Sequence, residues 1–377
     1  MFASLQNKHI NKMKINIQDK ISSGVSRVKA YTPGEQPDTA DWVKLNTNEF
    51  PFPPSPKVKD AILAELGNDA SALRLYPNPE SSKLREAVAQ HFNVDKKYAF
   101  AANGSDDILN LAIRAFSDNK KTIAALEPSY SLYPVLAKLQ DAELQNIPFN
   151  SDMSIPFEKI FNCGANIFFF TNPNAPTGIG FDEATVRKIV ENFNGIVLVD
   201  EAYAPFAGWS AAKLVEEYNN LIVTGTSSKG WGLAGMRIGW GLANPEVIEV
   251  LDRVRDSYNL DRLAQVAGVA ALADKQYYSE KIQLVLQERT RVEKFFDSLG
   301  WHYFKSATNF ILFTPKNSNN QAGAEIAKDL FEYLRKNKIL LRYFPNEKSI
   351  CNAIRLSIGT TEQMTKFIEA VQQWKNL

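Results

Sequence analysis

The chain has 377 residues, of which 45% are hydrophobic, and its 43 basic and 42 acidic side chains give a formal charge of +1. This length exceeds what a single small core requires and indicates two domains. The balanced charge argues against a nucleic-acid-binding or membrane-surface protein, because those partners select a basic excess. A small-molecule ligand is the remaining expectation.

The cysteine and histidine content limits the site chemistry further. Cys163 and Cys351 form neither a metal motif nor a disulfide framework, which is typical of a reducing compartment. The three histidines have no metal-binding spacing, so no metal site is expected. No apolar run approaches the ~20 residues of a membrane span, so we expect a cytoplasmic protein that binds neither membrane nor nucleic acid.

The N-terminal part is expected to be irregular. Six basic residues and one acidic residue within positions 1–30 indicate a solvated tail, with a nucleic-acid arm as the weaker alternative. Residues 31–57 are rich in proline, glycine and asparagine, which disfavours regular structure. Residues 57–66 and 81–92 have helical spacing, and Tyr76 lies in the loop between them.

From residue 98 onward, short apolar runs alternate with helical segments. Continuous hydrophobicity over a few residues is typical of strands that are buried on both faces of a parallel sheet. The alternation predicts an α/β fold, with a mostly parallel sheet covered by helices on both faces. The expected strands are 98–102, 122–126, 144–148, 167–170, 196–199 and 221–224.

Beyond residue 275 the pattern changes to that of a smaller α+β domain. The final helix is expected to begin at the capping box formed by Thr360 and Gln363. We divide the chain into an N-terminal arm that joins the small domain (1–45), a large ligand-binding domain (46–275) and a small C-terminal domain (276–377). The elements expected in the last part are helices 279–299 and 324–336 and strands 309–313, 339–344 and 354–358.

Lys229 is the strongest candidate for a catalytic residue. A lysine in isolation is most often a solvated surface cation, but here Thr226 and Ser228 place hydroxyls beside it. Arg237 follows a glycine-rich stretch and suits bidentate phosphate binding. Because a lysine amine in such a pocket can form a Schiff base, the pattern predicts a site for an aldehyde cofactor that carries a phosphate.

Asp200 and Tyr203 follow the apolar run that ends at residue 199. One interpretation of Asp200 is a structural helix cap. The alternative pairs its carboxylate with a pyridine nitrogen, which would keep the ring protonated and electron-withdrawing. Tyr203 would then reach the adjacent oxygen on the ring.

Two loops have side chains suited to a planar, phosphorylated ligand. Gly104, Ser105 and Asp106 lie where a strand leads into a helix, and a helix N-terminus binds anions, although an ordinary capped start explains the same residues. Tyr130 follows another strand and could stack on a ring, whereas a packing role is the common one for a loop aromatic.

Three further features remain open between binding and structural roles. The turn at residues 172–178, which contains Asn174, lies after an expected strand, where α/β proteins bind ligands, and is otherwise only a tight loop. Arg342 and Arg355 lie in apolar strands, and a buried arginine there requires an anion. That anion is either a substrate group or the carboxylate of a structural ion pair.

As an ordered set, these motifs resemble the fold-type I pyridoxal-phosphate aminotransferases, from residue 28 to the end of the chain. Among these enzymes the sequence is most similar to those that act on histidinol phosphate. The motifs are Tyr31-Thr32-Pro33-Gly34, Asn46-Thr47-Asn48-Glu49, Tyr76-Pro77, Asn103-Gly104-Ser105-Asp106, Pro128-Ser129-Tyr130, Pro176-Thr177-Gly178, Asp200-Glu201-Ala202-Tyr203, Ser228-Lys229, Arg237-Ile238-Gly239 and Arg355-Leu356-Ser357.

The resemblance implies pyridoxal 5'-phosphate as the cofactor and a role for each matching residue. Lys229 would form the Schiff base and move the proton, Asp200 would pair with the pyridine nitrogen, and Tyr203 would contact the ring oxygen. Tyr130 would stack on the ring. The phosphate would be held by Gly104, Ser105, Asp106, Thr226, Ser228 and Arg237, with Tyr76 contributed by the second subunit of a homodimer. Arg355 would bind the substrate α-carboxylate, and Tyr31 and Arg342 would approach the substrate's own phosphate. Asn48 would also belong to the substrate site.

The chain departs from the family pattern at one position. The asparagine that usually precedes Pro-Thr-Gly and contacts the ring oxygen is Ala175 here, and Asn174 stands one residue earlier. We expect Asn174 to take over this contact; otherwise the ring oxygen depends on Tyr203 alone.

The expected activity is ping-pong amino transfer between an amino donor, histidinol phosphate in the first place, and a 2-oxo acid such as 2-oxoglutarate. Two alternatives share the fold: a phosphothreonine-type decarboxylase and an aromatic amino acid aminotransferase. A third alternative, from another class, is a non-catalytic regulatory protein that binds the cofactor.

Overall fold

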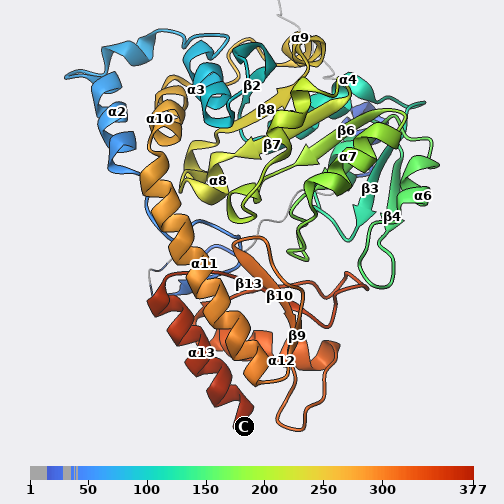
Figure 1. Ribbon diagram of the computed structural model, residues 1–377, viewed down its shortest axis with the longest axis vertical. Coiled ribbons are helices and arrows are strands. Elements are labelled where there is room, and N and C mark those ends of the chain that lie inside the picture. Colours follow the sequence, from blue (N-terminus) through green and yellow to red (C-terminus); the bar gives the residue numbers. More distant parts are fainter. Residues whose placement is uncertain (1–14, 29–34, 38, 40) are drawn as a thin grey trace, which may run out of the picture.

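The computed structural model describes residues 15–28, 35–37, 39 and 41–377. A large α/β unit contains most of the chain, and the C-terminal segment forms a smaller unit below it in Figure 1. The expected α/β class is confirmed. The boundaries proposed at residues 45 and 275 remain predictions.

The core of the large unit is a seven-stranded sheet in the order β2-β8-β7-β6-β5-β3-β4. The pairs β3–β4, β3–β5, β5–β6 and β6–β7 are parallel, whereas β8 runs antiparallel to both of its neighbours. The strands are β2 (Ala99–Ala102), β3 (Ile123–Glu127), β4 (Leu144–Pro148), β5 (Ile167–Thr171), β6 (Ile196–Asp200), β7 (Leu221–Thr226) and β8 (Gly239–Ala243).

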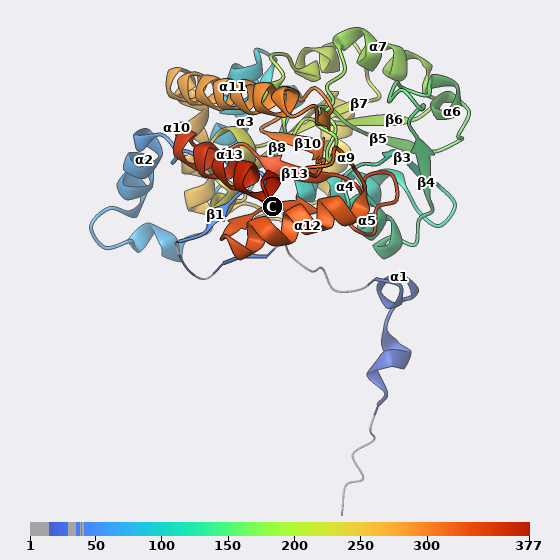
Figure 2. The same ribbon diagram turned by 90° about the horizontal axis from the view of Figure 1, so that it is seen from below.

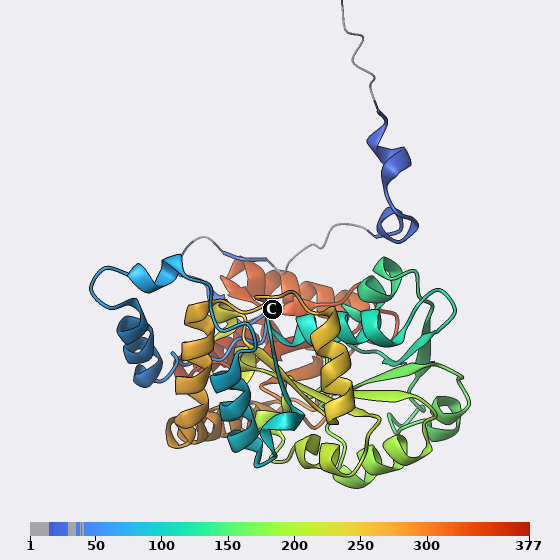
Figure 3. The same ribbon diagram turned by 90° about the horizontal axis from the view of Figure 1, so that it is seen from above.

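Helices cover both faces of this sheet (Figures 1 and 3). One face packs against α4 and α9 through a cluster that includes Phe169, Leu198 and Ile108, and the other packs against α3, α7 and α10. The helices are α2 (Pro56–Leu66), α3 (Ser82–Phe92), α4 (Ser105–Phe116), α5 (Tyr133–Leu139), α6 (Phe157–Phe161), α7 (Glu183–Asn192), α8 (Ser227–Gly230), α9 (Pro245–Val254) and α10 (Arg262–Ala273). Because helices bury both faces of the sheet, its central strands are apolar at most positions instead of alternating between apolar and polar residues.

All six strands expected in this region exist, within two residues at each end. Strand β8 was not expected, because its stretch of the sequence reads as a glycine-rich ligand loop. Its three small residues, Gly239, Gly241 and Ala243, give little of the β-branched pattern that indicates a strand. This segment is nevertheless a strand because β2 and β7 pair with it on its two sides.

The C-terminal unit contains the antiparallel sheet β12-β13-β10-β9 and three helices. The single strand expected over 339–344 is corrected: it divides into β11, which pairs with β1, and β12, which pairs with β13, so that the two parts join different sheets. The capping box of Thr360 and Gln363 is confirmed at the start of α13. The elements are β1 (Val43–Lys44), α11 (Lys275–Ser298), β9 (His302–Tyr303), β10 (Phe310–Thr314), α12 (Ala324–Lys336), β11 (Ile339–Leu340), β12 (Arg342–Tyr343), β13 (Ile354–Ser357) and α13 (Thr361–Lys375).

Residues 15–28 project from the body of the molecule in Figure 2, and α1 (Ser23–Ser26) contacts the end of α5. Arg27 forms an ion pair with Asp141 there. Six short 3-10 helices complete the described elements: η1 (Ile17–Lys20), η2 (Ser71–Arg74), η3 (Lys96–Tyr98), η4 (Ala204–Phe206), η5 (Ala211–Glu216) and η6 (Ala234–Met236).

Candidate active site

A cavity of about 220 Å³ opens where β5, β6 and β7 end. The carboxyl edge of a parallel sheet is the usual ligand site of α/β folds, because the strands deliver their last side chains to one place. Thr171, Asp200 and Thr226 are the final residues of these three strands, and all of them line the cavity. Nine residues that the sequence analysis assigned to a cofactor meet in its wall: Ser105, Asp106, Tyr130, Asp200, Tyr203, Thr226, Ser228, Lys229 and Arg237.

One end of the cavity is suited to a phosphate. Ser105 and Asp106 form the first turn of α4, whose free N–H groups attract anions. Arg237 lies opposite, with Nη2 at 3.5 Å from Asp106 Oδ2. Gly104 has a φ of 85°, and a Cβ at this position would lie 2.7 Å from Arg237 Nη2. The glycine therefore gives the guanidinium room beside the helix N-terminus.

Thr226 and Ser228 add hydroxyl groups to the same end. Thr226 caps α8 by accepting a hydrogen bond from the N–H of Ser228 at 3.1 Å, and its own hydroxyl donates to Ser228 Oγ at 3.0 Å. Arg237 Nη1 lies 3.4 Å from Ser228 Oγ. The short turn at α8 thus holds two hydroxyls and the catalytic lysine candidate, and Arg237 brings a guanidinium to the same pocket.

Asp200 lies in the floor of the cavity and is buried. Ala202 N–H donates to its Oδ1 at 3.2 Å, and the Tyr133 hydroxyl donates to its Oδ2 at 3.0 Å. Burial raises the pKa of Asp200 to about 6, and these two hydrogen bonds oppose that rise. The contact with Ala202 is of the capping type, but the carboxylate also lines the cavity, where it can pair with a cationic ring nitrogen.

Glu201, the next residue, points into different surroundings. Its carboxylate accepts hydrogen bonds from Ser210 Oγ at 2.5 Å and from the N–H of Ala211 at 2.6 Å. Burial raises the pKa of Glu201 to about 7, against the effect of these two donors. Glu201 therefore anchors the loop that contains Tyr203 rather than lining the cavity.

Lys229 reaches the cavity from α8. Its Nζ donates to the carbonyl oxygen of Thr47 at 3.1 Å and lies 5.9 Å from the centre of the Tyr203 ring. The Tyr203 hydroxyl in turn accepts a hydrogen bond from Asn48 Nδ2 at 2.9 Å. The amine and the phenol of the expected catalytic pair therefore share one wall.

A second cavity, of about 420 Å³, continues from the first through Thr47, Tyr130, Ala175 and Lys229, which line both. Arg342 and Arg355 line the second cavity and are direct partners across the antiparallel pair β12–β13. Both guanidiniums also lie over the ring of Phe344, at 5.7 and 5.5 Å. The two expected substrate arginines are thus neighbours in a cavity that Lys229 also lines.

Asn174, which was expected to contact the cofactor, is 1% exposed and lines neither cavity. Its Nδ2 donates to the carbonyl oxygen of Pro128, and its Oδ1 accepts from the N–H and the hydroxyl of Thr177. Both ends of the side chain hold the turn together, while Ala175 faces the cavities.

Asn48 and Tyr76, two other expected site residues, line neither of these two cavities. Asn48 is fully buried between Tyr203 and Ser357. Tyr76 is 76% exposed and stacks on Tyr258, with ring centres 4.4 Å apart. Tyr31 lies outside the described residues.

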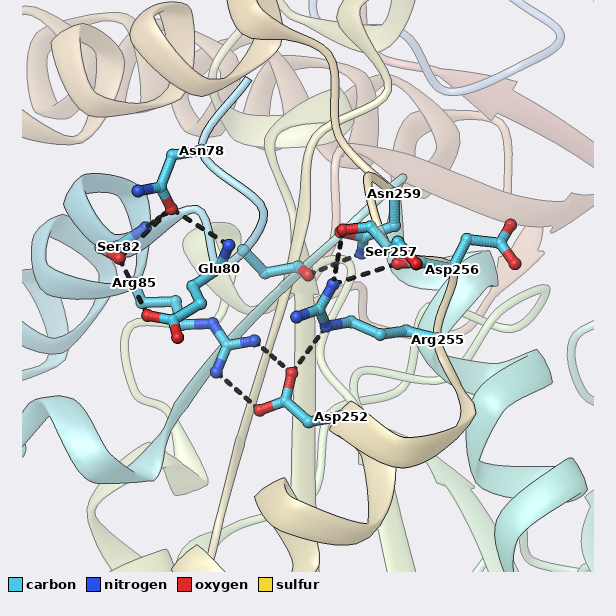
Figure 4. A network of polar contacts seen from close by, with 10 residues as sticks. Asn78, Glu80, Ser82, Arg85, Asp252, Arg255, Asp256, Ser257 and Asn259 are labelled. Carbon is cyan, nitrogen blue, oxygen red and sulfur yellow. Dashed lines mark hydrogen bonds and ion pairs between the residues drawn. The ribbon is translucent and has the colours of Figure 1, made fainter. Parts of the chain in front are cut away.

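The loop that contains Tyr76 is held firmly in place. Arg262 donates to the carbonyl oxygen of Tyr76 at 2.9 Å. The segment that contains Tyr258 is fixed by the network in Figure 4, where Asp252 accepts a bidentate contact from Arg85 and a further hydrogen bond from Arg255. Tyr76 is therefore presented on the surface by a rigid support.

Tyr133 and Thr171 belong to the site although neither was expected there. The Tyr133 hydroxyl lies 2.6 Å from Thr171 Oγ1, which in turn lies 3.0 Å from Ser129 Oγ. Burial and the nearby Asp200 carboxylate raise the pKa of the Tyr133 phenol well above its usual range, so it stays a donor. The available sequence signal was its position three residues after Tyr130, at the start of a helix.

The cavity fits pyridoxal 5'-phosphate in its donor set. It offers a phosphate cradle that an added Cβ at Gly104 would fill, an amine for the aldehyde, an acid for the ring nitrogen and an aromatic side chain, Tyr130. Fold and site together define a pyridoxal-phosphate enzyme of fold type I.

Comparison with known proteins agrees with this class. The family model for aminotransferase class I and II matches residues 40–371. The histidinol-phosphate aminotransferases of Geobacter sulfurreducens and Geotalea uraniireducens are 40% and 41% identical to the chain, covering 93% and 94% of it and 98% and 99% of the relatives. The chain belongs to the class I and II aminotransferases and is a pyridoxal-phosphate-dependent transaminase.

The solved histidinol-phosphate aminotransferase of Sinorhizobium meliloti, in complex with pyridoxal-5'-phosphate, has a similar fold. Its TM-score is 0.80 at 23% identity, over 88% of this chain and 90% of that one. Within the described residues, no helix has the length and apolarity needed to cross a membrane, and no cluster of three or more metal-ligating side chains is found there.

Proposed function

We propose that this transaminase transfers an amino group between histidinol phosphate and 2-oxoglutarate, with imidazole-acetol phosphate and glutamate as the other pair. The observation that carries the proposal is the pairing of Arg342 with Arg355 across β12–β13. Two arginines that are neighbours in a sheet and line the same cavity favour an anionic group of the substrate there. A substrate phosphate meets that requirement better than a single carboxylate does. The names of the relatives that are about 40% identical support the same substrate.

The residues of the first cavity are assigned to the cofactor. The cofactor supplies an electron sink that stabilises the negative charge left at the reacting carbon. In our proposal Lys229 moves the proton at that carbon, Asp200 keeps the ring nitrogen protonated and Tyr203 donates to the ring oxygen. Tyr130 covers the ring, and the α4 N-terminus with Thr226, Ser228 and Arg237 holds the phosphate.

Two finer points belong to the same proposal. We propose a homodimer in which the exposed Tyr76 reaches the cofactor phosphate of the partner subunit; its 76% exposure and its rigid support favour this role. We also propose that the protein works in the cytoplasm, since Cys163 and Cys351 are both free thiols in the structure.

A panel of amino donors tests the substrate. Histidinol phosphate, histidinol, phosphothreonine and an aromatic amino acid are compared by kcat/KM with 2-oxoglutarate as the acceptor. Arg342→Gln should lower kcat/KM for histidinol phosphate about 10- to 100-fold, since a hydrogen bond to a charged group contributes about 1.5–3 kcal/mol. The rate with histidinol, which lacks the phosphate, should change little.

Arg335→Gln is the matched control, because Arg335 pairs with Glu35 on the exposed side of α12. It should leave every rate unchanged. Equal kcat/KM values for histidinol phosphate and histidinol would refute the phosphate assignment. Release of carbon dioxide from phosphothreonine without transfer to the oxo acid would establish the decarboxylase alternative instead.

A further inference from the structure

Asn48 is held on every side by hydrogen bonds. It is 1% exposed and has a φ of 57°, in the left-handed region. Its backbone N–H donates to Ser357 Oγ at 2.9 Å, and its carbonyl oxygen accepts from Asn309 Nδ2 at 3.1 Å. Its Oδ1 accepts from Ser357 Oγ at 2.8 Å, and its Nδ2 donates to the Tyr203 hydroxyl oxygen at 2.9 Å. Each polar atom of this residue therefore has a partner.

The hydrogen bonds around Asn48 run in one consistent direction. Ser357 Oγ accepts from the backbone N–H of Asn48 and donates its own hydrogen to Asn48 Oδ1. In this orientation of the amide, Nδ2 faces Tyr203. Because an amide nitrogen only donates, the phenol oxygen is the acceptor in that contact. The hydroxyl hydrogen of Tyr203 must therefore point elsewhere.

The remaining surroundings of Tyr203 direct that hydrogen into the cavity. Tyr203 lines the first cavity beside Lys229. It otherwise packs in a small apolar cluster with Ala175, Ala202 and Phe310, and none of these three described neighbours has a polar side-chain group. The cavity is thus the side on which the hydroxyl can find an acceptor.

We infer that Asn48 is a positioning residue that holds the Tyr203 hydroxyl as a hydrogen-bond donor toward the cofactor's ring oxygen. The inference rests on the proposed role of Tyr203, and it adds a residue that does not itself touch the cofactor cavity. The side chain of Ala175 lines the cavity and has no hydrogen-bond donor. An oriented Tyr203 hydroxyl therefore explains how a single donor can satisfy the ring oxygen.

The backbone beside Asn48 serves the same site. The carbonyl oxygen of Thr47 accepts from Lys229 Nζ at 3.1 Å, and that of Asn46 accepts from Arg355 Nη2 at 3.2 Å. Three consecutive residues therefore contact the amine, the phenol and one arginine of the anion site. A change at residue 48 is expected to act through Tyr203 because the other two contacts are made by backbone atoms of different residues.

The test removes the amide without straining the backbone. Glycine tolerates a φ of 57°, so Asn48→Gly keeps the local conformation. Asn48→Gly, Tyr203→Phe and the double variant are prepared as cofactor-loaded proteins without substrate. The readouts are the pH midpoint of the near-visible absorption change of the bound cofactor and the dissociation constant for pyridoxal phosphate. Asn93→Gly is the matched control, since Asn93 has the same left-handed φ, 55°, at the exposed end of α3.

A hydrogen bond to an ionised oxygen favours its ionised form, so losing the donor should move the midpoint upward by roughly one unit. Asn48→Gly is expected to shift it in the same direction as Tyr203→Phe, and the double variant should shift no further than Tyr203→Phe alone, because both changes remove one interaction. Asn93→Gly should leave the midpoint in place. Ser357→Ala, which releases the amide orientation, should give a smaller shift of the same sign.

A wild-type midpoint in Asn48→Gly, or shifts that add in the double variant, would overturn the inference. Both outcomes are separable from failure of the proposed function. If wild-type protein binds no pyridoxal phosphate, the role of the whole cavity is wrong; if Tyr203→Phe shifts the midpoint and Asn48→Gly does not, only the role of Asn48 is wrong.

Discussion

At the scale of single residues, the site depends on how burial and hydrogen bonds set the pKa of Asp200. Burial favours the neutral carboxyl and is the main reason that the pKa of Asp200 is raised to about 6. Tyr133 and the N–H of Ala202 work in the opposite direction by donating to the ionised form. The carboxylate that the proposed reaction needs near neutral pH is thus maintained by a phenol that the sequence analysis did not single out.

Tyr133→Phe should weaken cofactor binding most strongly at low pH. Without the phenol the pKa of Asp200 rises further above about 6, so the carboxyl is neutral over a wider range and no longer pairs with a protonated ring. Affinity for pyridoxal phosphate should therefore fall as pH drops toward about 6 and approach the wild-type value near pH ~8. Titration of the apoprotein with pyridoxal phosphate between about pH 5 and pH 8 measures this.

Tyr303→Phe is the control for Tyr133→Phe, because it also removes a hydroxyl that donates to a carboxylate, that of Asp297, at 3.0 Å. It should leave the affinity and its pH dependence unchanged. If Tyr133→Phe lowered affinity equally at every pH, its hydroxyl would act by packing rather than on the ionisation of Asp200.

At the scale of elements, the decisive contact is between β8 and the start of α4. Gly239 begins β8 and lies between Ala102 of β2 and Thr226 of β7. A Cβ at Gly239 would lie 2.5 Å from both the carbonyl oxygen of Gly104 and the nitrogen of Ser105. The helix N-terminus that forms the phosphate cradle can approach the sheet only because this strand begins with glycine.

Gly239→Ala should therefore displace the first turn of α4 and reduce affinity for pyridoxal phosphate by at least about 10-fold. Because the neighbouring atoms are backbone, the clash cannot be relieved by a rotamer change, and overpacking should cost roughly 1–3 kcal/mol of folding stability. The cofactor dissociation constant and the thermal unfolding of the apoprotein measure the two effects.

Gly241→Ala tests the same substitution two residues along β8, where a Cβ would meet Ile108 Cδ1 at 3.4 Å, an ordinary contact. It should leave cofactor affinity close to that of the wild type. Similar losses for both variants would show that alanine in β8 disturbs the strand itself and not the cradle.

At the scale of the whole molecule, the position of Tyr76 argues for a site shared between subunits. The ring lies on the surface, outside the wall of the cavity that holds Lys229, and stacks on Tyr258. Arg255 helps to fix the Tyr258 segment by donating to the carbonyl oxygens of Asp256 and Ser257, as Figure 4 shows. A side chain presented so firmly to the outside is suited to a partner of the same chain.

Mixing subunits tests this arrangement. Tyr76→Phe and Lys229→Ala proteins are exchanged by reversible dissociation and assayed at limiting pyridoxal phosphate. If Tyr76 acts in the partner's site, a mixed dimer contains one site with both side chains, and activity should recover to about a quarter of the wild-type level for random pairing. Activity no higher than the mean of the two unmixed variants would place Tyr76 in its own subunit's site or outside it.

The sequence by itself determined the strand positions of the large sheet and most of the residues in the cavity. Strands buried on both faces must be continuously apolar, and this pattern is visible in the local sequence. Catalysis requires particular side chains at strand ends, so the residues around Asp200 and Lys229 could also be recognised locally. Local patterns could not reveal β8, whose small residues lack strand character, or the division of 339–344 into two strands, because pairing partners decide both.

Tertiary structure alone decided how distant residues combine. Three contacts of the site join residues that are far apart in the sequence: Tyr133 with Asp200 (67 positions), Asn48 with Tyr203 (155) and Gly239 with Gly104 (135). The local sequence around one residue of each pair does not indicate the other. The contacts of Asn174 were also decided by the tertiary structure. Its residue type suited a ligand contact, but its polar atoms form hydrogen bonds with Pro128 and Thr177. The hydrogen-bond partner of a buried polar group depends on the tertiary structure, because any donor or acceptor that the fold brings close enough can satisfy that group.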